Sequence, residues 1–269
     1  MDQKDIFHED DYQVVMPVPE TACFIPGTQI ELVRDLDVPA QPEHVLFDFD
    51  GTLSLVREGW IPIMTDLMVE VLLDTGTDEP VEDLRKLAND TILRLNGKQT
   101  IYQMIQLAGE VNKRGGVPRE PLEYKQEYHN RLMQHIHNRR EALRNGSLEP
   151  ETLLVPHTLK LLGLLQTQDV HLYLASGTDE LYVREEVELL GLTEYFGNHI
   201  YGAIDDYRAF SKKMVIERIL QENRVDGTKL LGFGDGYIEI ENVKSAGGVA
   251  VAVASDESGR SGRPDAWKR

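Results

Sequence analysis

A short apolar segment that ends in two carboxylates constrains this chain more than any other feature. Residues 45–49 read Val-Leu-Phe-Asp-Phe, and Asp50-Gly51 follows directly. The apolar run predicts a buried strand, and the glycine predicts a tight turn at its end. Because side chains two apart in a strand point the same way, Asp48 and Asp50 are expected to lie close together. Two buried carboxylates are costly without a cation between them, and oxygen ligands of this kind favour Mg²⁺.

Composition and charge exclude several classes of protein. The chain has 269 residues, 41% of them hydrophobic, which allows one large domain or two modest ones with a packed core. A single cysteine, Cys23, excludes an intrachain disulfide. The net charge of −18 repels nucleic acid and anionic membranes, so we expect neither as a partner. The polar start at residues 1–5 and the absence of a membrane-length apolar run predict a soluble cytoplasmic protein.

Two kinds of pattern follow the motif strand. Between Gly59 and Pro156, apolar residues recur every three or four positions, which predicts consecutive amphipathic helices. Beyond Pro156, short apolar runs alternate with helical patterns, which predicts βα units and a parallel sheet covered on both faces. The predicted helices are 60–73, 81–95, 100–111, 122–143, 180–190, 212–220 and 238–246, and the predicted strands after the first are 170–175, 200–204, 229–233 and 249–254.

The two ends of the chain carry no chemical motif. Within residues 1–44, two strand-like runs at 13–15 and 29–33 are separated by prolines and a glycine. We interpret this segment as a leader that packs against the domain, with a partner-binding arm as the alternative. The polar residues 256–269 contain two Ser-Gly pairs, which predicts a loose loop and tail.

Two further motifs offer groups that suit an anion. Ser176-Gly177-Thr178 follows the strand 170–175, and its hydroxyl and open backbone N–H groups can contact a phosphoryl oxygen, although such a turn is also common without a function. Lys212 opens a predicted helix, where a lysine opposes the helix dipole and is disfavoured unless an anion lies near. Two solvated lysines, Lys212 and Lys213, are the alternative interpretation.

The last motif adds acidic groups at another strand end. The strand 229–233 leads into Gly234-Asp235-Gly236, and Glu239 follows four residues after Asp235, one helical turn along. Ligands of parallel sheets bind at the carboxyl ends of the strands, where all these motifs lie.

Asp48-Phe49-Asp50-Gly51-Thr52-Leu53 resembles the first motif of the haloacid dehalogenase (HAD) superfamily, and the later motifs follow in the family's order. The resemblance covers residues 45–254. It implies an α/β fold with a Rossmann-like doubly wound parallel sheet and an inserted helical cap. The implied core comprises residues 1–53 and 156–269, with 1–44 as an N-terminal extension, and the implied cap is 54–155.

The same resemblance implies phosphoryl transfer through an aspartyl-phosphate intermediate. Asp48 would be the nucleophile, and Asp50 would protonate the leaving alkoxide and then deprotonate the attacking water. Ser176, Gly177 and Lys212 would bind the phosphoryl group. The implied Mg²⁺ ligands are Asp48, the backbone carbonyl of Asp50, Asp235 and Glu239.

Two positions need a choice within the family pattern. Lys212 is preferred to Lys213 because the apolar residues Val215 and Ile216 follow it in the family's register. Glu239 departs from the pattern, since the family usually carries aspartate there, and its longer side chain would reach the metal through water.

The sequence predicts the reaction class better than the substrate. Arg57 follows the motif turn, and Lys98 precedes a cap helix, where it can meet a carboxylate or a second phosphate; an exposed lysine is an equally good interpretation. We expect a Mg²⁺-dependent phosphatase for a small phosphorylated metabolite, either a sugar phosphate or a phosphoglycolate-like acid. A phosphomutase that uses the same residues is the alternative, and a non-catalytic binding or regulatory module is the third hypothesis.

Overall fold

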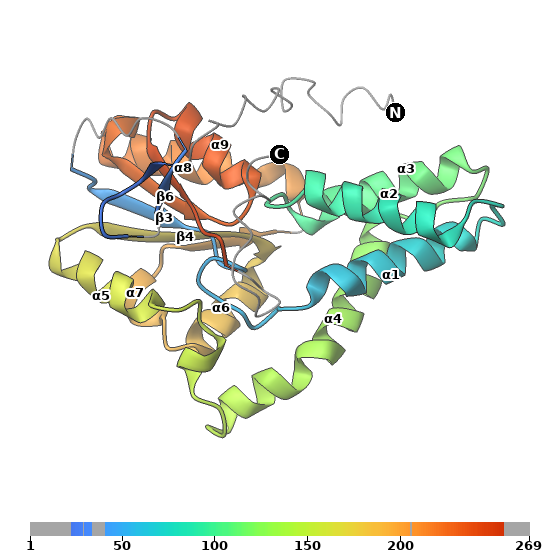
Figure 1. Cartoon of the computed structure of the whole chain (residues 1–269), viewed down its shortest axis with the longest axis horizontal. Coiled ribbons are helices and arrows are strands. Elements are labelled where there is room, and N and C mark those ends of the chain that lie inside the picture. The colour runs from blue at the N-terminus through green and yellow to red at the C-terminus, as the bar shows by residue number, and fades with distance from the viewer. Residues whose placement is uncertain (1–22, 29, 34–40, 205, 256–269) are drawn as a thin grey trace. The chain divides into compact units, whose positions relative to one another are not determined.

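The computed structural model describes residues 23–28, 30–33, 41–204 and 206–255 (Figure 1). The predicted strand at 13–15 and the predicted tail at 256–269 lie outside these residues. The described residues before position 40 belong to a small unit of their own, in which β1 (Cys23–Phe24) pairs antiparallel with β2 (Glu31–Leu32). The strand β2 falls inside the predicted run 29–33.

A five-stranded sheet forms the centre of the larger unit. Its strand order is β5-β4-β3-β6-β7, and every neighbouring pair is parallel. The central strand β3 (His44–Phe47) is buried along its whole length, as expected for a strand covered on both faces. The predicted doubly wound α/β fold is therefore confirmed. The other strands are β4 (His171–Asp179), β5 (Ile200–Ala203), β6 (Leu230–Gly234) and β7 (Val249–Ala252).

Helices cover both faces of the sheet because successive side chains of β3 point in opposite directions. Val45 and Phe47 belong to one buried cluster, which includes side chains of α5, α6 and α7. Leu46 belongs to a second cluster with α8 and α9, so the two groups of helices lie on opposite faces (Figure 1). These helices are α5 (Thr158–Thr167), α6 (Glu180–Leu189), α7 (Thr193–Phe196), α8 (Lys212–Asn223) and α9 (Tyr237–Ser245).

The residues between β3 and α5 are largely helical. Helix α1 (Trp60–Leu73) packs against α2 (Val81–Arg94) and α4 (Pro121–Arg144), and α3 (Thr100–Lys113) packs against α4. Each helix begins and ends within two residues of the prediction. The start of α4 is fixed by a capping box, in which the side chains of the residues before and inside its first turn bond to each other's backbone N–H groups.

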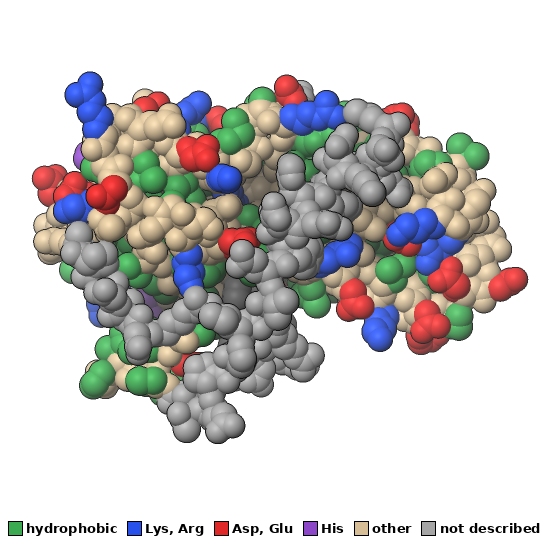
Figure 2. All heavy atoms as spheres, turned by 90° about the horizontal axis from the view of Figure 1, so that it is seen from above, with side chains coloured by type: hydrophobic (Ala, Val, Ile, Leu, Met, Phe, Trp, Pro, Cys, Tyr) green, Lys and Arg blue, Asp and Glu red, His purple; other side chains and the backbone are tan. Residues whose placement is uncertain are grey.

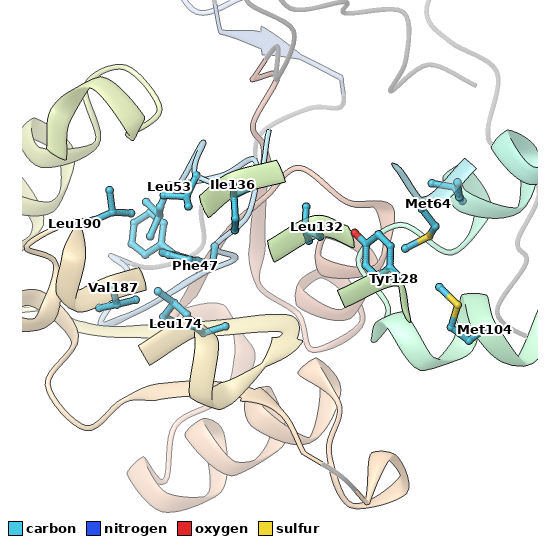
Figure 3. Close-up of a cluster of buried hydrophobic side chains, with 14 of the residues drawn as sticks. Phe47, Leu53, Met64, Met104, Tyr128, Leu132, Ile136, Leu174, Val187 and Leu190 are labelled. Atoms are coloured by element: carbon cyan, nitrogen blue, oxygen red, sulfur yellow. The ribbon is translucent and has the colours of Figure 1, made fainter. Parts of the chain in front are cut away.

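Helix α4 connects the apolar interior of the sheet with that of the helices. Its side chains Tyr124, Tyr128, Leu132 and Ile136, spaced four residues apart, belong to one continuous buried cluster, and Figure 3 labels the last three. The division into a core and a cap of residues 54–155 remains a prediction, and this cluster crosses it. The labelled members run from Phe47, Leu174, Val187 and Leu190 through Ile136, Leu132 and Tyr128 to Met64 and Met104.

The structure differs from the sequence prediction in a few places. Strand β4 continues to Asp179 instead of ending at Ala175, with a register shift between these two residues. Helix α5 has no predicted counterpart, because its leucines occupy several sides and blur the period. The short helices η3 (Pro150–Leu153), α7, η4 (Tyr207–Ala209) and η5 (Gly227–Lys229) also lack a counterpart.

The described surface carries mixed charge. In Figure 2, acidic and basic side chains lie interspersed on the described part of the visible face. Many of them pair, as Arg131 does with Glu70 and Glu127 on the helical region. Among the described residues, no helix combines the length and apolar character needed to cross a membrane.

Candidate active site

The carboxyl ends of β3, β4 and β6 bring the predicted site residues together. Phe47 of β3 lies opposite Leu174 of β4 and Phe233 of β6, so the residues that follow each of them reach the same edge. The backbone N–H of Asp48 donates to the carbonyl of Phe233 at 2.9 Å, which extends this pairing by one residue. A cavity of about 80 Å³ opens at this edge. Its lining includes Asp48, Asp50, Arg57, Lys98, Ser176, Gly177, Lys212 and Asp235.

Lys212 lies against the predicted nucleophile. Ser211 caps helix α8, its hydroxyl accepting from the N–H of Met214, so Lys212 is the first residue of the helix. Its buried Nζ donates to Oδ1 of Asp48 at 2.6 Å and also to Oε1 of Glu239. The neighbouring Lys213 is exposed. The geometry therefore favours Lys212 over Lys213 as the lysine of this site.

The charges of this group are unbalanced. Burial raises the pKa of Asp48 to about 6, although the ammonium of Lys212 acts in the opposite direction. Burial alone would lower the pKa of Lys212, but the attraction of Asp48 and Glu239 outweighs it and holds the pKa above its ordinary value. One ammonium thus serves two buried carboxylates, and Asp50 and Asp235 line the same cavity.

Asp50 is held by one of its two oxygens. Gly51 has a φ of +74°, a conformation that glycine adopts without strain, and it turns the chain directly after Asp50. Oδ2 of Asp50 accepts hydrogen bonds from Oγ1 of Thr178 at 2.9 Å and Oγ of Ser176 at 3.3 Å. Oδ1 is buried without a hydrogen bond and lies 3.6 Å from Nε of Arg57. The hydroxyl of Ser176, predicted to contact phosphate, therefore contacts Asp50 here.

Arg57 is bound to the chain's own carboxylates. It is buried, and its guanidinium donates to both oxygens of Glu186 on α6, at 3.0 and 2.9 Å. Arg140 of α4 lies beside the same carboxylate and bonds to Glu185. Burial would lower the pKa of Arg57, but attraction by Glu186 and Asp50 raises it above its ordinary value. Arg57 lines the cavity, yet its hydrogen bonds orient it toward α6.

The loop between α2 and α3 meets the Asp235 region. Gly97 has a φ of +86°, and a Cβ built there would lie 2.6 Å from Oε2 of Glu239, so a larger residue would displace that carboxylate. The side-chain amide of Gln99 donates to the carbonyls of Tyr207 and Phe210, at 2.9 and 2.8 Å. These contacts join the start of α3 to the segment that leads into Lys212. Lys98, the predicted specificity residue, is half-buried between them.

The donor groups suit Mg²⁺, although they do not form a ready-made metal site. Among the described residues, no three His, Cys, Asp or Glu side chains are grouped closely enough to hold a metal. However, Oε2 of Glu239 is buried without a hydrogen bond, and an unpaired buried carboxylate oxygen is costly. Carboxylate and carbonyl oxygens are the ligands that Mg²⁺ prefers. The residues therefore fit the predicted ion by their chemistry.

The sequence does not predict several residues of the site. Glu186 carries a weak signal, because it is an acid on the apolar face of α6 between Val183 and Val187. Thr178 stood next to the predicted Ser176-Gly177 pair, but its bond to Asp50 depends on the extension of β4. Met64 and Gln103, which also line the cavity, carry no signal beyond helical periodicity.

Residues 42–247 match the family model of haloacid dehalogenase-like hydrolases. The chain belongs to this family. The predicted superfamily membership is thus confirmed, and the protein is a hydrolase. No curated protein sequence matches the chain as a relative.

Solved structures share the HAD fold at low sequence identity. A predicted phosphoglycolate phosphatase from Haemophilus somnus 129PT has 18% identity and a TM-score of 0.50, covering 79% of this chain and 85% of that one. β-Phosphoglucomutase from Clostridium difficile has 14% identity and a TM-score of 0.53, covering 79% and 84%. A family IA, variant 3 HAD hydrolase from Entamoeba histolytica has 20% identity and a TM-score of 0.52, covering 80% and 85%. At these identities the likeness shows the fold alone.

Proposed function

We propose that this HAD-family hydrolase is a Mg²⁺-dependent phosphatase acting on a small phosphorylated metabolite. The observation that carries the proposal is the buried contact between Asp48 and Lys212 in a cavity that also contains Asp50 and Asp235. A carboxylate nucleophile, a neighbouring acid and a fixed cation are the groups that phosphoryl transfer to an aspartate needs. The resemblance of the fold to a predicted phosphoglycolate phosphatase is consistent with this activity.

In the proposed reaction, a carboxylate oxygen of Asp48 attacks phosphorus and the bond to the ester oxygen breaks. Asp50 donates a proton to the leaving alkoxide. Water then attacks the aspartyl phosphate, Asp50 takes the proton of that water, and orthophosphate leaves. The hydrogen bonds from Thr178 and Ser176 hold Oδ2 of Asp50, which supports Oδ1 as the oxygen that transfers the proton.

The other groups neutralise charge on the phosphoryl oxygens. Lys212 is positioned at the nucleophile, and Gly177 lines the cavity beside Ser176, where its backbone N–H would bond a phosphoryl oxygen. Asp48, the backbone carbonyl of Asp50, Asp235 and Glu239 would hold the ion. When bound, Mg²⁺ supplies positive charge that offsets the repulsion between the carboxylate and the phosphate ester.

A phosphomutase is the second candidate. The fold resembles β-phosphoglucomutase, and such an enzyme would use the same nucleophile and acid. It differs by passing the phosphoryl group back to a sugar instead of to water. Product analysis on a sugar phosphate separates the two, because hydrolysis releases orthophosphate whereas mutase activity exchanges isomers without it.

The test is phosphate release from p-nitrophenyl phosphate, with Mg²⁺ or with EDTA, by the wild type and by Asp48→Asn. The proposal predicts metal-dependent turnover that disappears in the variant. No turnover by folded, Mg²⁺-saturated protein on this or any other ester would overturn it. A mutase, or a binding module if Mg²⁺ also fails to bind, would then be the better hypothesis.

A further inference from the structure

The cavity has a charged side and a nearly neutral side. The strand ends and α8 contribute Asp48, Asp50, Asp235 and Lys212, where the proposed chemistry takes place. On the helical side, α1 contributes Trp60 and Met64, which lie one turn apart. Helix α3 contributes Thr100 and Gln103, which also lie one turn apart. This helical side must contact whatever the phosphate is esterified to, because the charged side contacts the phosphate.

Gln103 of this side has a buried side-chain oxygen without a hydrogen-bond partner among the described residues. Its side chain is only 3% exposed, and its buried Oε1 accepts no hydrogen bond within the described structure. An unsatisfied buried amide is costly, so it is expected at a position where a ligand completes the bonding. Gln99, on the preceding turn, also has an unpartnered Oε1, but its amide nitrogen is bonded to two carbonyls and it does not line the cavity.

A hydroxyl is the ligand group that best completes Gln103. A hydroxyl both donates and accepts, so it satisfies the amide whichever way the oxygen and nitrogen are placed. Thr100, on the same face of α3, can bond a second hydroxyl of the ligand through its own hydroxyl. Trp60 and Met64 offer apolar surface to the carbon skeleton of the ligand. Neutral polar groups beside an apolar surface suit an alcohol with several hydroxyls.

A carboxylate suits this side less well. The guanidinium of Arg57 is already bound by Glu186, and the ammonium of Lys212 by Asp48 and Glu239. A further negative charge would enter a cavity already lined by three carboxylates. Lys98 also lines the cavity, and its ammonium would favour a carboxylated ester instead.

We propose that Gln103 is a specificity-determining residue that hydrogen-bonds a hydroxyl of the leaving alcohol. The substrates are then phosphate monoesters of neutral polyhydroxylated alcohols, namely polyol or sugar phosphates, in preference to carboxylated esters such as phosphoglycolate. This inference rests on the proposed phosphatase function, and it selects between the two substrate classes that the sequence left open.

The experiment measures kcat/KM with Mg²⁺ for five esters: glycerol 3-phosphate, glucose 6-phosphate, propyl phosphate, phosphoglycolate and p-nitrophenyl phosphate. The wild type is expected to prefer the better of the two hydroxylated esters over propyl phosphate and phosphoglycolate by about tenfold or more. Gln103→Met, which keeps the length of the side chain but removes its hydrogen bonds, is expected to lower kcat/KM for that ester about tenfold more than for p-nitrophenyl phosphate.

Two variants serve as controls. Gln106→Met makes the same change one turn further along α3, outside the cavity lining, and is expected to leave the ratio between the substrates unaltered. Lys98→Met tests the competing cation, and it is expected to lower turnover of the preferred ester less than Gln103→Met does.

The outcomes separate the two proposals. Turnover of p-nitrophenyl phosphate with a preference for phosphoglycolate, and a larger effect of Lys98→Met, would overturn the inference and leave the phosphatase standing. An equal loss on all esters in Gln103→Met would mean that the residue is only structural. The wild-type comparison of the better hydroxylated ester with propyl phosphate and phosphoglycolate needs no variant, so it tests the substrate class even if Gln103→Met does not fold. No turnover of any ester overturns both proposals.

Discussion

Two buried groups of charges flank Asp50, and they are built differently. The Lys212 cluster, which we define as Lys212, Asp48 and Glu239, has one ammonium for two carboxylates and leaves an oxygen of Glu239 unbonded. The Arg57 cluster, defined as Arg57, Glu186 and Arg140, has two guanidiniums around one fully bonded carboxylate. The first has a surplus of negative charge at a cavity, whereas the second lies where the segment after β3, α4 and α6 meet.

The difference shows how a reactive site can be distinguished from a structural contact between helices. Burial is equally strong in both clusters, so burial alone identifies neither as functional. The Lys212 cluster differs because it has a net negative charge, and a metal ion would supply the missing positive charge. The Arg57 cluster needs no further positive charge. It holds the guanidinium of Arg57 beside Asp50, with Nε at 3.6 Å from Oδ1. The following predictions test this contrast.

The largest effect is expected for Asp48→Asn in the Lys212 cluster. Loss of the nucleophile is expected to lower kcat by about a thousandfold or more, because the covalent step has no substitute. Stability in EDTA is expected to hold or rise, since a buried carboxylate with a raised pKa is removed. Phosphate release and urea unfolding measure the two quantities. A kcat within tenfold of the wild type contradicts the assigned role.

In the Arg57 cluster, stability is expected to fall instead. Glu186→Met leaves two buried guanidiniums without their shared carboxylate and is expected to cost about 3–5 kcal/mol of unfolding free energy. The double variant Arg57→Met/Glu186→Met is expected to recover much of this loss, because a buried pair can be replaced by packed apolar side chains. Urea unfolding of the two single variants and the double variant measures the coupling. Additive losses would show that the pair does not act as a unit.

Metal binding is expected to stabilise only the protein with an intact Lys212 cluster. Mg²⁺ at a hundred times its Kd should add about 2.7 kcal/mol to the free energy of unfolding of the wild type. Glu239→Gln is expected to weaken this response, while its stability in EDTA changes by less than about 1 kcal/mol because one surplus charge is lost. Thermal unfolding over a Mg²⁺ titration gives both values, with Ca²⁺ and EDTA as controls. An unchanged response in Glu239→Gln would remove Glu239 from the ligand set.

The smallest effect is expected outside both clusters, at His44. Burial lowers the pKa of His44, and the stacked ring of His171 lowers it further. The unfolded state therefore binds the proton first as the pH falls through about 6.5, and the folded state loses stability by no more than about 1.4 kcal/mol per pH unit. Urea unfolding at pH 7.5 and 5.5 should show a smaller loss in His44→Gln. An equal loss in His44→Gln and in the wild type would show that another group sets this pH dependence.

The local parts of this structure could be predicted from the sequence. The strand before Asp48, the glycine turn after Asp50 and the start of α8 at Lys212 are all set by residues within a few positions of one another. Helices α1 to α4 were placed within two residues because their apolar spacing is regular. The fold class followed from the alternation of these elements and from the resemblance to the family.

The parts that failed depend on contacts between distant segments. Glu186 reaches Arg57 across 129 positions, and no pattern near either residue indicates the pair. The extension of β4 past Ala175 pairs with the distant strand β5, and it includes Thr178, which bonds to Asp50. Gln103 looks like any polar residue of an amphipathic helix until the cavity is known. The roles of Asp48, Lys212 and the other site residues stay predictions until they are tested.

The pairing of Phe47 with Leu174 and Phe233 also determines where the chain tolerates changes in length. Each site residue lies a fixed number of positions after Phe47, Leu174 or Phe233, so the pairing of the strands sets the distances between the site residues. One residue inserted between Phe47 and Asp48 would place a different side chain at the position that Asp48 now holds beside Phe233. Insertions into exposed connections at the other end of the strands, such as residues 224–226 between α8 and η5, would leave that spacing intact. Engineered insertions and fusions should therefore be tolerated best at the edge of the sheet away from the site.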